Sequence, residues 1–127
     1  MLKEAVICIV IIIGIFGLEY YTQSFTEKTV SEVTNIFNKI EDNISKRDIE
    51  QINNEIKIIV DKWEEKQKKL AYYIEHDELE KVNTAIVTMK SYVATENFSE
   101  AMAELEEGKF VIEHIQEKNS FNLQNIF

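Results

Sequence analysis

The sequence predicts an all-α protein in which an N-terminal transmembrane helix precedes an antiparallel, up-down-up-down four-helix bundle. The 127 residues include no proline and only three glycines, so the residues that punctuate β-rich folds are nearly missing. Apolar residues recur at intervals of three and four after the N-terminal region, which is typical of helices with one buried face. Near the N-terminus, Ala5 to Leu18 carries no charged or hydrogen-bonding polar side chain.

This apolar run is the first predicted element. It is shorter than the roughly 17–25 residues of a membrane-spanning helix, but Leu2 extends it on one side, and Tyr20 and Tyr21 extend it on the other. Residues 2–21 then form a helix of about 30 Å at 1.5 Å per residue, which spans a bilayer. We therefore expect residues 1–21 to be an uncleaved signal anchor in contact with the lipid bilayer.

The alternatives to an anchor fit less well. A cleaved signal peptide needs a pair of small residues after its apolar region, whereas Leu18 is followed by Glu-Tyr-Tyr-Thr-Gln. A lipoprotein signal would place its cysteine after the apolar run, but Cys8 lies within it. A buried core segment would not explain the position at the extreme N-terminus.

The distribution of lysines predicts the orientation. Lys3 and the α-amino group precede the apolar run, and the next basic residue is Lys28. By the positive-inside rule, the N-terminus lies in the cytoplasm and the rest of the chain outside it. The expected location is thus the cell membrane, with a single pass and an extracytoplasmic bundle.

Residues 22–118 form the predicted bundle, with helices over 24–44, 46–75, 77–95 and 98–118. Each helix has one apolar stripe that can pack in a shared core. The stripe residues are Val30, Val33, Phe37, Ile40 and Ile44; Ile49, Ile52, Ile56, Ile59, Trp63, Leu70, Tyr73 and Ile74; Leu79, Val82, Ile86, Met89 and Val93; and Phe98, Ala101, Met102, Leu105, Gly108, Ile112 and Ile115. A dimeric coiled coil, which would make the protein a homo-oligomer, is the alternative architecture, but no stripe stays in phase for long.

Polar residues predict where these helices begin. Ser24 with Glu27 matches a capping box, which indicates a new helix after the membrane. Ser45, Asp77, and either Asn97 or Ser99 are the expected caps of the later helices. The second helix would be about 45 Å long against about 30 Å for its neighbours, so it either overhangs the bundle or bends near its lysine-rich segment, residues 62–69.

The last residues form an apolar tail, residues 119–127. Phe121, Leu123, Ile126 and Phe127 are unusual at a chain end, where polar residues are common. We expect this tail to dock on the bundle, with contact to the bilayer surface or insertion into a partner as alternatives.

Charge and motif content exclude several function classes. With 14 Lys+Arg against 23 Asp+Glu the net charge is −9, which argues against nucleic acid, because that affinity comes from basic groups that release counterions. The sequence has no second cysteine for a zinc or haem motif and no glycine-rich phosphate loop. We therefore expect no enzymatic activity and no cofactor.

The two histidines are the main candidates for chemistry. In the predicted topology the second and fourth helices end at the membrane-proximal side, so His76 and His114 lie there among acidic residues. His76 and Glu80 share a helix face and, with His114, form a weak candidate metal site or a pH switch. The alternative is that each histidine only stabilises a helix C-terminus through the helix dipole. The Glu-x-x-His motif of di-iron bundles is absent, since Tyr73 and Val111 occupy its glutamate positions.

Other notable side chains also have structural explanations. Trp63 lies on an apolar stripe, where core packing is the default, although stripe aromatics such as Trp63, Tyr72 and Tyr73 can line a ligand pocket between helices. The lysines of residues 62–69 are expected on a solvated face, with contact to anionic lipid headgroups as the alternative if the second helix reaches the bilayer.

Several blocks resemble a bacterial family of unknown function. They are Trp63 to Gln67, the sequence Ile-Glu-His-Asp-Glu-Leu-Glu at 74–80, and the ending Asn-Leu-Gln-Asn-Ile-Phe at 122–127. Members of this family are small, membrane-anchored proteins of Clostridia and related Firmicutes. The resemblance implies no activity, cofactor or site.

The resemblance selects a set of residues to mutate first, as a cluster that fixes helix ends or docks a membrane partner. This set is Trp63, His76, Asp77, Glu78, His114, Asn125 and Phe127. The leading hypothesis is a non-enzymatic, membrane-anchored bundle that binds another membrane or envelope protein. The alternatives are a ligand- or metal-sensing bundle and a passive structural component of the envelope or spore.

Overall fold

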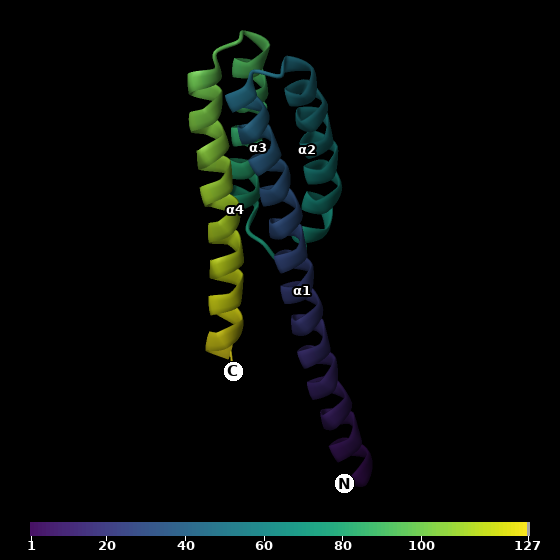
Figure 1. The fold of residues 1–127 in the computed structure, drawn as a ribbon. Helices are drawn as coiled ribbons and strands as arrows, with labels where there is room; N and C mark the ends of the chain where they lie inside the picture. Colours follow the sequence, from purple (N-terminus) through teal and green to yellow (C-terminus); the bar gives the residue numbers. More distant parts are fainter. Residues whose placement is uncertain (127) are drawn as a thin grey trace.

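The computed structural model describes residues 1–126, with side chains through Ser120, and within this range the chain is built from four α-helices. They are α1 (Leu2–Lys46), α2 (Ile49–Leu70), α3 (His76–Ala94) and α4 (Phe98–Ile126). The helices alternate in direction, and each packs against two neighbours in the order α1, α2, α3, α4 and back to α1 (Figure 1). The predicted all-α class and four-helix architecture are confirmed.

The first helix is longer than predicted. The sequence suggested a new helix at Ser24, but α1 runs for 45 residues without a break. Neither proline nor glycine occurs between Leu18 and Lys46, so nothing in this part of the chain interrupts the backbone hydrogen bonds. The hydroxyls of Thr22 and Thr26 donate to carbonyls of the preceding turn at 3.0 and 2.8 Å, a geometry compatible with a continuing helix.

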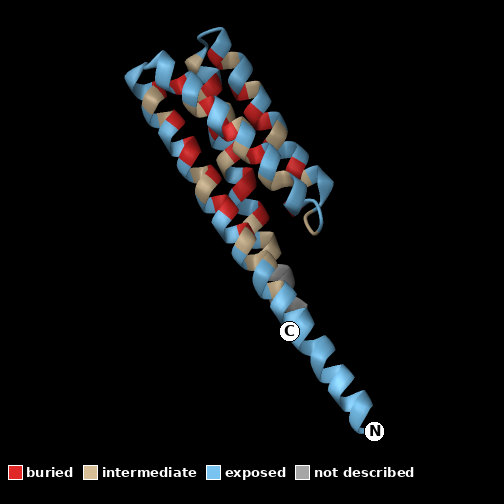
Figure 2. Ribbon diagram, turned by 90° about the vertical axis from the view of Figure 1, so that its right-hand side faces the viewer, coloured by how far each residue is buried: buried red, intermediate tan, exposed pale blue. Residues whose placement is uncertain are grey.

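The two halves of α1 have different surroundings. Among the described residues, α1 is the one helix that is long and apolar enough to cross a membrane, and the apolar window is entirely unburied. Figure 2 shows this half as an exposed rod that extends beyond the bundle, whereas the other half contributes to the core. The apolar segment and the bundle therefore share one helix.

The second helix is shorter than predicted. It ends at Leu70, after 22 residues, so it neither overhangs the bundle nor bends at its lysines. Backbone amides of Tyr72 and Tyr73 donate to the carbonyls three residues earlier, at 3.2 and 3.1 Å, which tightens the chain into a turn. Residues 71–75 form this turn, and His76 begins α3.

The core contains nearly all the predicted stripe residues. Phe37, Trp63 and Met89 are among its largest fully buried side chains, and most other stripe residues are buried or packed against them. One exception is Ile49, the first residue of α2, which is 42% exposed. The buried polar residues Thr26 and Thr29 were not predicted; they continue the α1 stripe toward its apolar half.

A close contact between helices explains the single glycine of the bundle. A Cβ atom on Gly108 of α4 would lie 2.8 Å from Cζ of Phe37 in α1 and 3.4 Å from Cβ of Ala85 in α3. The first distance is shorter than normal packing allows. Glycine at position 108 thus lets side chains of two neighbouring helices approach α4 closely.

The two turns at the far end of the bundle share one design. Arg47 and Glu96 adopt left-handed conformations with φ of 54° and 56°. In each turn the amide of this residue donates three residues back, and the amide of the next residue donates five residues back, which is the Schellman motif. That next residue, Asp48 or Asn97, then caps the following helix through its side chain, with distances of 3.2 and 3.4 Å to the backbone amide three residues on.

Besides the start at Ser24 and the end of the second helix, three further predicted helix boundaries need correction. Ser45 is not a cap, because its hydroxyl donates to the carbonyl of Glu41 within α1. Asp77 lies in the first turn of α3, whose N-cap is Glu75 without a side-chain cap bond. The fourth helix does not end at residue 118 but continues to Ile126. The predicted contacts of the tail side chains, including Asn125 and Phe127, lie outside the described residues.

Candidate functional site

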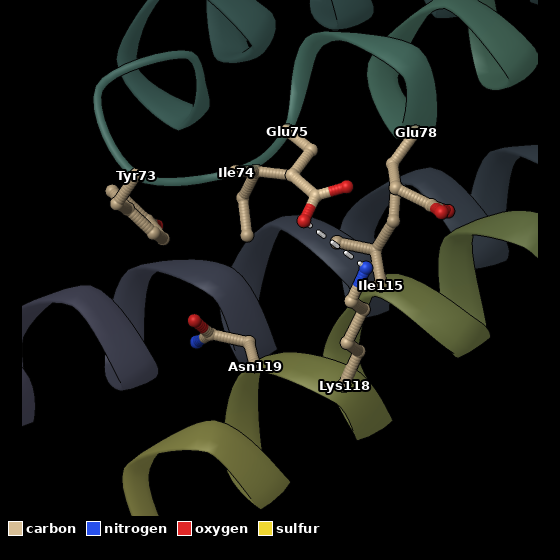
Figure 3. Close-up of a pocket in the computed structure, with 7 residues that line it drawn as sticks. All are labelled: Tyr73, Ile74, Glu75, Glu78, Ile115, Lys118 and Asn119. Atoms are coloured by element: carbon tan, nitrogen blue, oxygen red, sulfur yellow. Dashed lines mark ion pairs between the residues drawn. The ribbon is translucent and has the colours of Figure 1, made fainter. Parts of the chain in front are cut away.

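Three elements meet at the end of the bundle from which the apolar half of α1 extends. The turn at residues 71–75 lies between α1, just beyond its apolar segment, and the last described turns of α4. The turn, the first turn of α3 and α4 surround a pocket of about 80 Å³, which is lined by Tyr73, Ile74, Glu75, Glu78, Ile115, Lys118 and Asn119 (Figure 3).

Tyr73 ties the turn to α1. Its hydroxyl lies 2.7 Å from Oγ1 of Thr26 and donates to the carbonyl of Thr22 at 3.1 Å. The side-chain amide nitrogen of Asn119 in α4 donates to Oγ1 of Thr26 at 3.5 Å. Two helices, α1 and α4, and the turn are thus joined by one hydrogen-bond network, which fixes the helix positions where α1 leaves the bundle.

The surroundings of Tyr73 keep its phenol neutral. Burial raises the pKa of Tyr73 above its ordinary value of 10.0, and the nearby Tyr21 adds to this effect. The hydrogen bond with Thr26 acts in the opposite direction. At neutral pH the phenol therefore serves as a hydrogen-bonding group and does not act as a base.

Charged residues close the outer side of the pocket. Nζ of Lys118 in α4 lies 3.4 Å from a carboxylate oxygen of Glu75 in the turn, as Figure 3 shows. Glu78 is paired through one oxygen with Lys81 at 3.8 Å, and its other oxygen is buried without a hydrogen-bond partner among the described residues. The Lys118–Glu75 pair thus joins α4 to the turn before α3, the Lys81–Glu78 pair lies within α3, and one acceptor of Glu78 is unused.

The histidines lie outside this pocket. His76 begins α3 and does not end the second helix, so the predicted stabilisation of a helix C-terminus is wrong for this residue. Its Nε2 is 3.6 Å from an oxygen of Glu80, and its side chain is 82% exposed. His114 is exposed on α4 and stacks on Phe110 with ring centroids 6.4 Å apart. Within residues 1–120, no group of three or more potential metal-ligating side chains comes together.

Of the seven residues selected from the sequence, the five whose side chains the structure describes are thus distributed over the bundle. Glu78 lines the pocket, and Asp77 is exposed beside it in the first turn of α3. Trp63 is buried in the core of α2, two helical turns before the end of that helix. Whether these residues act in partner binding stays a prediction.

Sequence reasoning missed the network around Tyr73. Thr22 and Thr26 are spaced by four residues and precede the stripe position Val30 by the same interval, so they lie on the buried face of α1. That spacing could have shown from the sequence alone that the two threonines lie on the buried face of α1. Their link to Asn119 was not predictable, because α4 was expected to end at residue 118.

A second concave surface lies between α2 and α3, which are the most loosely packed neighbouring helices of the bundle. The groove has a volume of about 260 Å³ and is lined by Val60, Trp63, Glu64, Gln67, Asn83, Ile86 and Val87. Trp63 forms part of its wall and is only 2% exposed, and no described residue accepts a hydrogen bond from its indole Nε1. Val87 is 57% exposed at the groove.

Comparison with known proteins identifies one family. The sequence profile of a domain of unknown function (DUF4363) matches residues 20–126, which is the bundle without the apolar segment. No curated protein and no solved structure matches the chain.

Proposed function

The chain belongs to the DUF4363 family of unknown function, and we propose that it is a non-enzymatic membrane protein whose extracytoplasmic bundle binds another membrane or envelope protein. The observation that carries this proposal is the continuity of α1. One helix has an unburied apolar half that is long enough for a bilayer and a second half that supplies the core of the bundle. A protein built in this way holds its bundle at a membrane.

The arrangement of polar groups supports a binding role in place of catalysis. Tyr73, Thr26 and Asn119 use their polar atoms to bond one another, and Lys118 pairs with Glu75. These interactions immobilise the helices where the bundle meets the membrane segment. A fixed orientation helps a protein that presents one face to a neighbour in the same membrane, because less freedom is lost on binding.

The groove between α2 and α3 is the proposed contact surface. A partner helix that lies in it would cover Val87 and the exposed edge of Val60, in the manner of an amphipathic helix bound in a groove. Buried tryptophans often mark such positions, and the indole Nε1 of Trp63 has no acceptor within the described chain. The partner we expect is a helical protein of the same membrane.

Orientation completes the proposal. Lys3 and the N-terminus are on the cytoplasmic side, and the bundle is outside the cell membrane. The relation to proteins of Clostridia and other Firmicutes, which the sequence blocks suggest, is part of the same proposal.

Site-specific photocrosslinking in the native host tests the contact surface. A photoreactive residue at Val87 should crosslink to a specific membrane protein, and one at the exposed Asn38 on the opposite side of the bundle should not. The substitution Asn83→Arg, at a half-buried polar position of the groove, should abolish the crosslink if the groove is the interface, while the amount of protein in the membrane stays the same.

The other functional hypotheses predict different results. Crosslinks from Val87 to the same chain alone would indicate a homo-oligomer. A melting temperature that rises by several degrees with a metal or a metabolite would favour the sensing bundle. Absence of any crosslink, together with a deletion that has no phenotype, would favour a passive structural component.

A further inference from the structure

We propose that Lys66 and Lys69 of α2, together with Tyr21 and Phe25 of α1, form a binding site for the headgroup of an anionic phospholipid. The lipid belongs to the leaflet from which α1 emerges into the bundle. This inference rests on the proposed insertion of α1 in a membrane, and it adds a ligand and a site that the partner groove does not involve.

The four side chains form one cluster. Nζ of Lys66 lies 5.3 Å from the ring centre of Phe25, and Nζ of Lys69 lies 5.6 Å from the same ring. The ring of Tyr21 stacks on Phe25 with centroids 6.3 Å apart and an interplanar angle of 13°. Both ammonium groups are within the range of a cation–π interaction, so the aromatic pair positions them beside α1.

The cluster lies at the depth of lipid headgroups. Phe25 follows Leu18, the last residue of the apolar run, by seven positions, which corresponds to about 10 Å along a helix. Tyr21 lies one turn closer to the membrane and is 58% exposed, as an interfacial aromatic residue would be. A lysine side chain is long enough to extend its ammonium toward the phosphate layer.

The charge of the cluster is not balanced within the protein. Lys62 and Lys66 share one carboxylate oxygen of Glu32, at 3.9 and 3.8 Å. Among the described residues, no carboxylate lies within 4 Å of Nζ of Lys69, including Glu65 one turn earlier on the same helix. Three ammonium groups thus face one carboxylate, on a bundle that is acidic overall.

A phospholipid phosphate matches these features. Its negative charge can be placed near Lys66 and Lys69, and its glycerol and upper acyl carbons can lie against Tyr21 and Phe25. Each lysine near an anionic surface is expected to strengthen lipid association by up to about fivefold, and less when it is partly neutralised, as Lys66 is by Glu32. Binding of this kind would hold α2 at the bilayer and set the tilt of the bundle.

Lipid selectivity of the full-length chain tests the proposal. The protein is reconstituted in phosphatidylcholine vesicles, and electron spin resonance measures the motionally restricted fraction of spin-labelled phosphatidylglycerol and spin-labelled phosphatidylcholine. The wild type should prefer phosphatidylglycerol by at least about twofold. The variant Lys66→Gln/Lys69→Gln should show a ratio close to one, and Lys69→Gln alone should lie between them.

The control carries the same change in charge at distant sites. Lys57 and Lys90 are exposed on α2 and α3, away from the membrane end, so Lys57→Gln/Lys90→Gln should keep the wild-type ratio. A wild-type ratio of one, or an equal loss in both double variants, overturns the proposed lipid site. Circular dichroism of Lys69→Gln, whose side chain is exposed, verifies that the loss does not come from misfolding.

The same measurement separates this proposal from the membrane anchor on which it rests. If the chain does not insert, neither spin-labelled lipid shows a restricted component, and the anchor itself is wrong. If restricted lipid appears without selectivity, the anchor stands and the lipid site is wrong.

Discussion

The missing Cβ atom of Gly108 determines how closely three helices pack. The absence of a Cβ atom lets Phe37 fill the space between α1 and α4, with Ala85 of α3 beside it. Glycine inside a helix ordinarily costs about 1 kcal/mol relative to alanine. Its presence at a buried stripe position is therefore explained by packing against Phe37.

The substitution Gly108→Ala tests this contact. The helix would gain about 1 kcal/mol from better propensity, but the new methyl group would overlap with a fully buried ring, at a cost of about 1–3 kcal/mol. We expect a net loss of about 1 kcal/mol in the free energy of unfolding, measured by urea denaturation in detergent micelles.

The same substitution in a protein that already carries Phe37→Leu separates the effect of helix propensity from the effect of steric overlap. In the variant Phe37→Leu the ring is gone, so Gly108→Ala should now stabilise the protein by up to about 1 kcal/mol. The same loss in both backgrounds would mean that Phe37 is not the cause.

Tyr73 connects stability to pH at the end of the bundle from which the apolar half of α1 extends. Its pKa is raised in the folded protein, chiefly by burial, so the folded state holds the phenolic proton more tightly than the unfolded state. The resulting stability is present in full below the unfolded value of about 10 and is lost as the pH rises through the folded value.

The variant Tyr73→Phe removes this dependence. It should lower the free energy of unfolding by about 1 kcal/mol at pH 7, because the hydrogen bonds to Thr22 and Thr26 are lost. Between pH 9.5 and 11, the melting temperature of the wild type should fall more steeply than that of the variant. The exposed neighbour Tyr72 is the control, since Tyr72→Phe should change neither quantity; parallel pH curves for wild type and Tyr73→Phe would refute the assignment.

At the scale of elements, the turns at the far end of the bundle carry strain that glycine would relieve. Arg47 and Glu96 adopt positive φ angles, which are unfavourable for residues with a side chain. Each conformation persists because the Schellman hydrogen bonds and the following side-chain cap require it. These turns explain how helices reverse direction in a chain that has no glycine between Gly17 and Gly108.

Glycine at either position should stabilise the protein. We expect Arg47→Gly and Glu96→Gly to raise the free energy of unfolding by about 0.5–1 kcal/mol each. This gain is reduced by the additional conformational entropy that glycine gives to the unfolded chain. Chemical denaturation measures the change. Lys57→Gly, at an exposed position inside α2, should instead lower stability by about 1 kcal/mol; destabilisation at all three sites would contradict the proposed strain.

The elements also show where sequence reasoning succeeds and where it fails. Stripes such as Val33, Phe37 and Ile40 were predicted because burial of a helix face imposes a regular spacing. The ends of helices were less predictable. Ser24 has the sequence of a cap, but its local preference is weaker than the continuous hydrogen bonding of α1, and nothing near Leu70 marks the end of α2.

The site was predictable only in part for the same reason. The location of Glu75 and Glu78 at the end of the bundle from which the apolar half of α1 extends follows from the up-down arrangement of the helices, which the sequence predicted. The network of Tyr73, Thr26 and Asn119 depends on the extent of α4 and on the turn after α2, and neither was predicted. His76 changed from the end of one helix to the beginning of the next, because α2 stops six residues before it.

At the scale of the whole molecule, the continuous α1 couples its apolar half to the bundle. No loop separates the two parts, so a rotation or tilt of the apolar half would move the bundle with it. The tyrosine network and the proposed lipid site both lie where the helix passes from one environment to the other. The proposed partner contact and the proposed lipid site therefore both depend on α1 as a membrane anchor with the bundle outside the cell.

Accessibility of single cysteines tests that dependence most directly. The only natural cysteine, Cys8, is replaced by alanine, and one cysteine is then placed at Asn38 in the bundle or at Lys3 near the N-terminus. A membrane-impermeant maleimide applied to intact cells should label Asn38→Cys and should label Lys3→Cys only after the membrane is permeabilised. Labelling of Lys3→Cys in intact cells, with Asn38→Cys protected, would contradict the proposed topology and the partner and lipid assignments that follow from it.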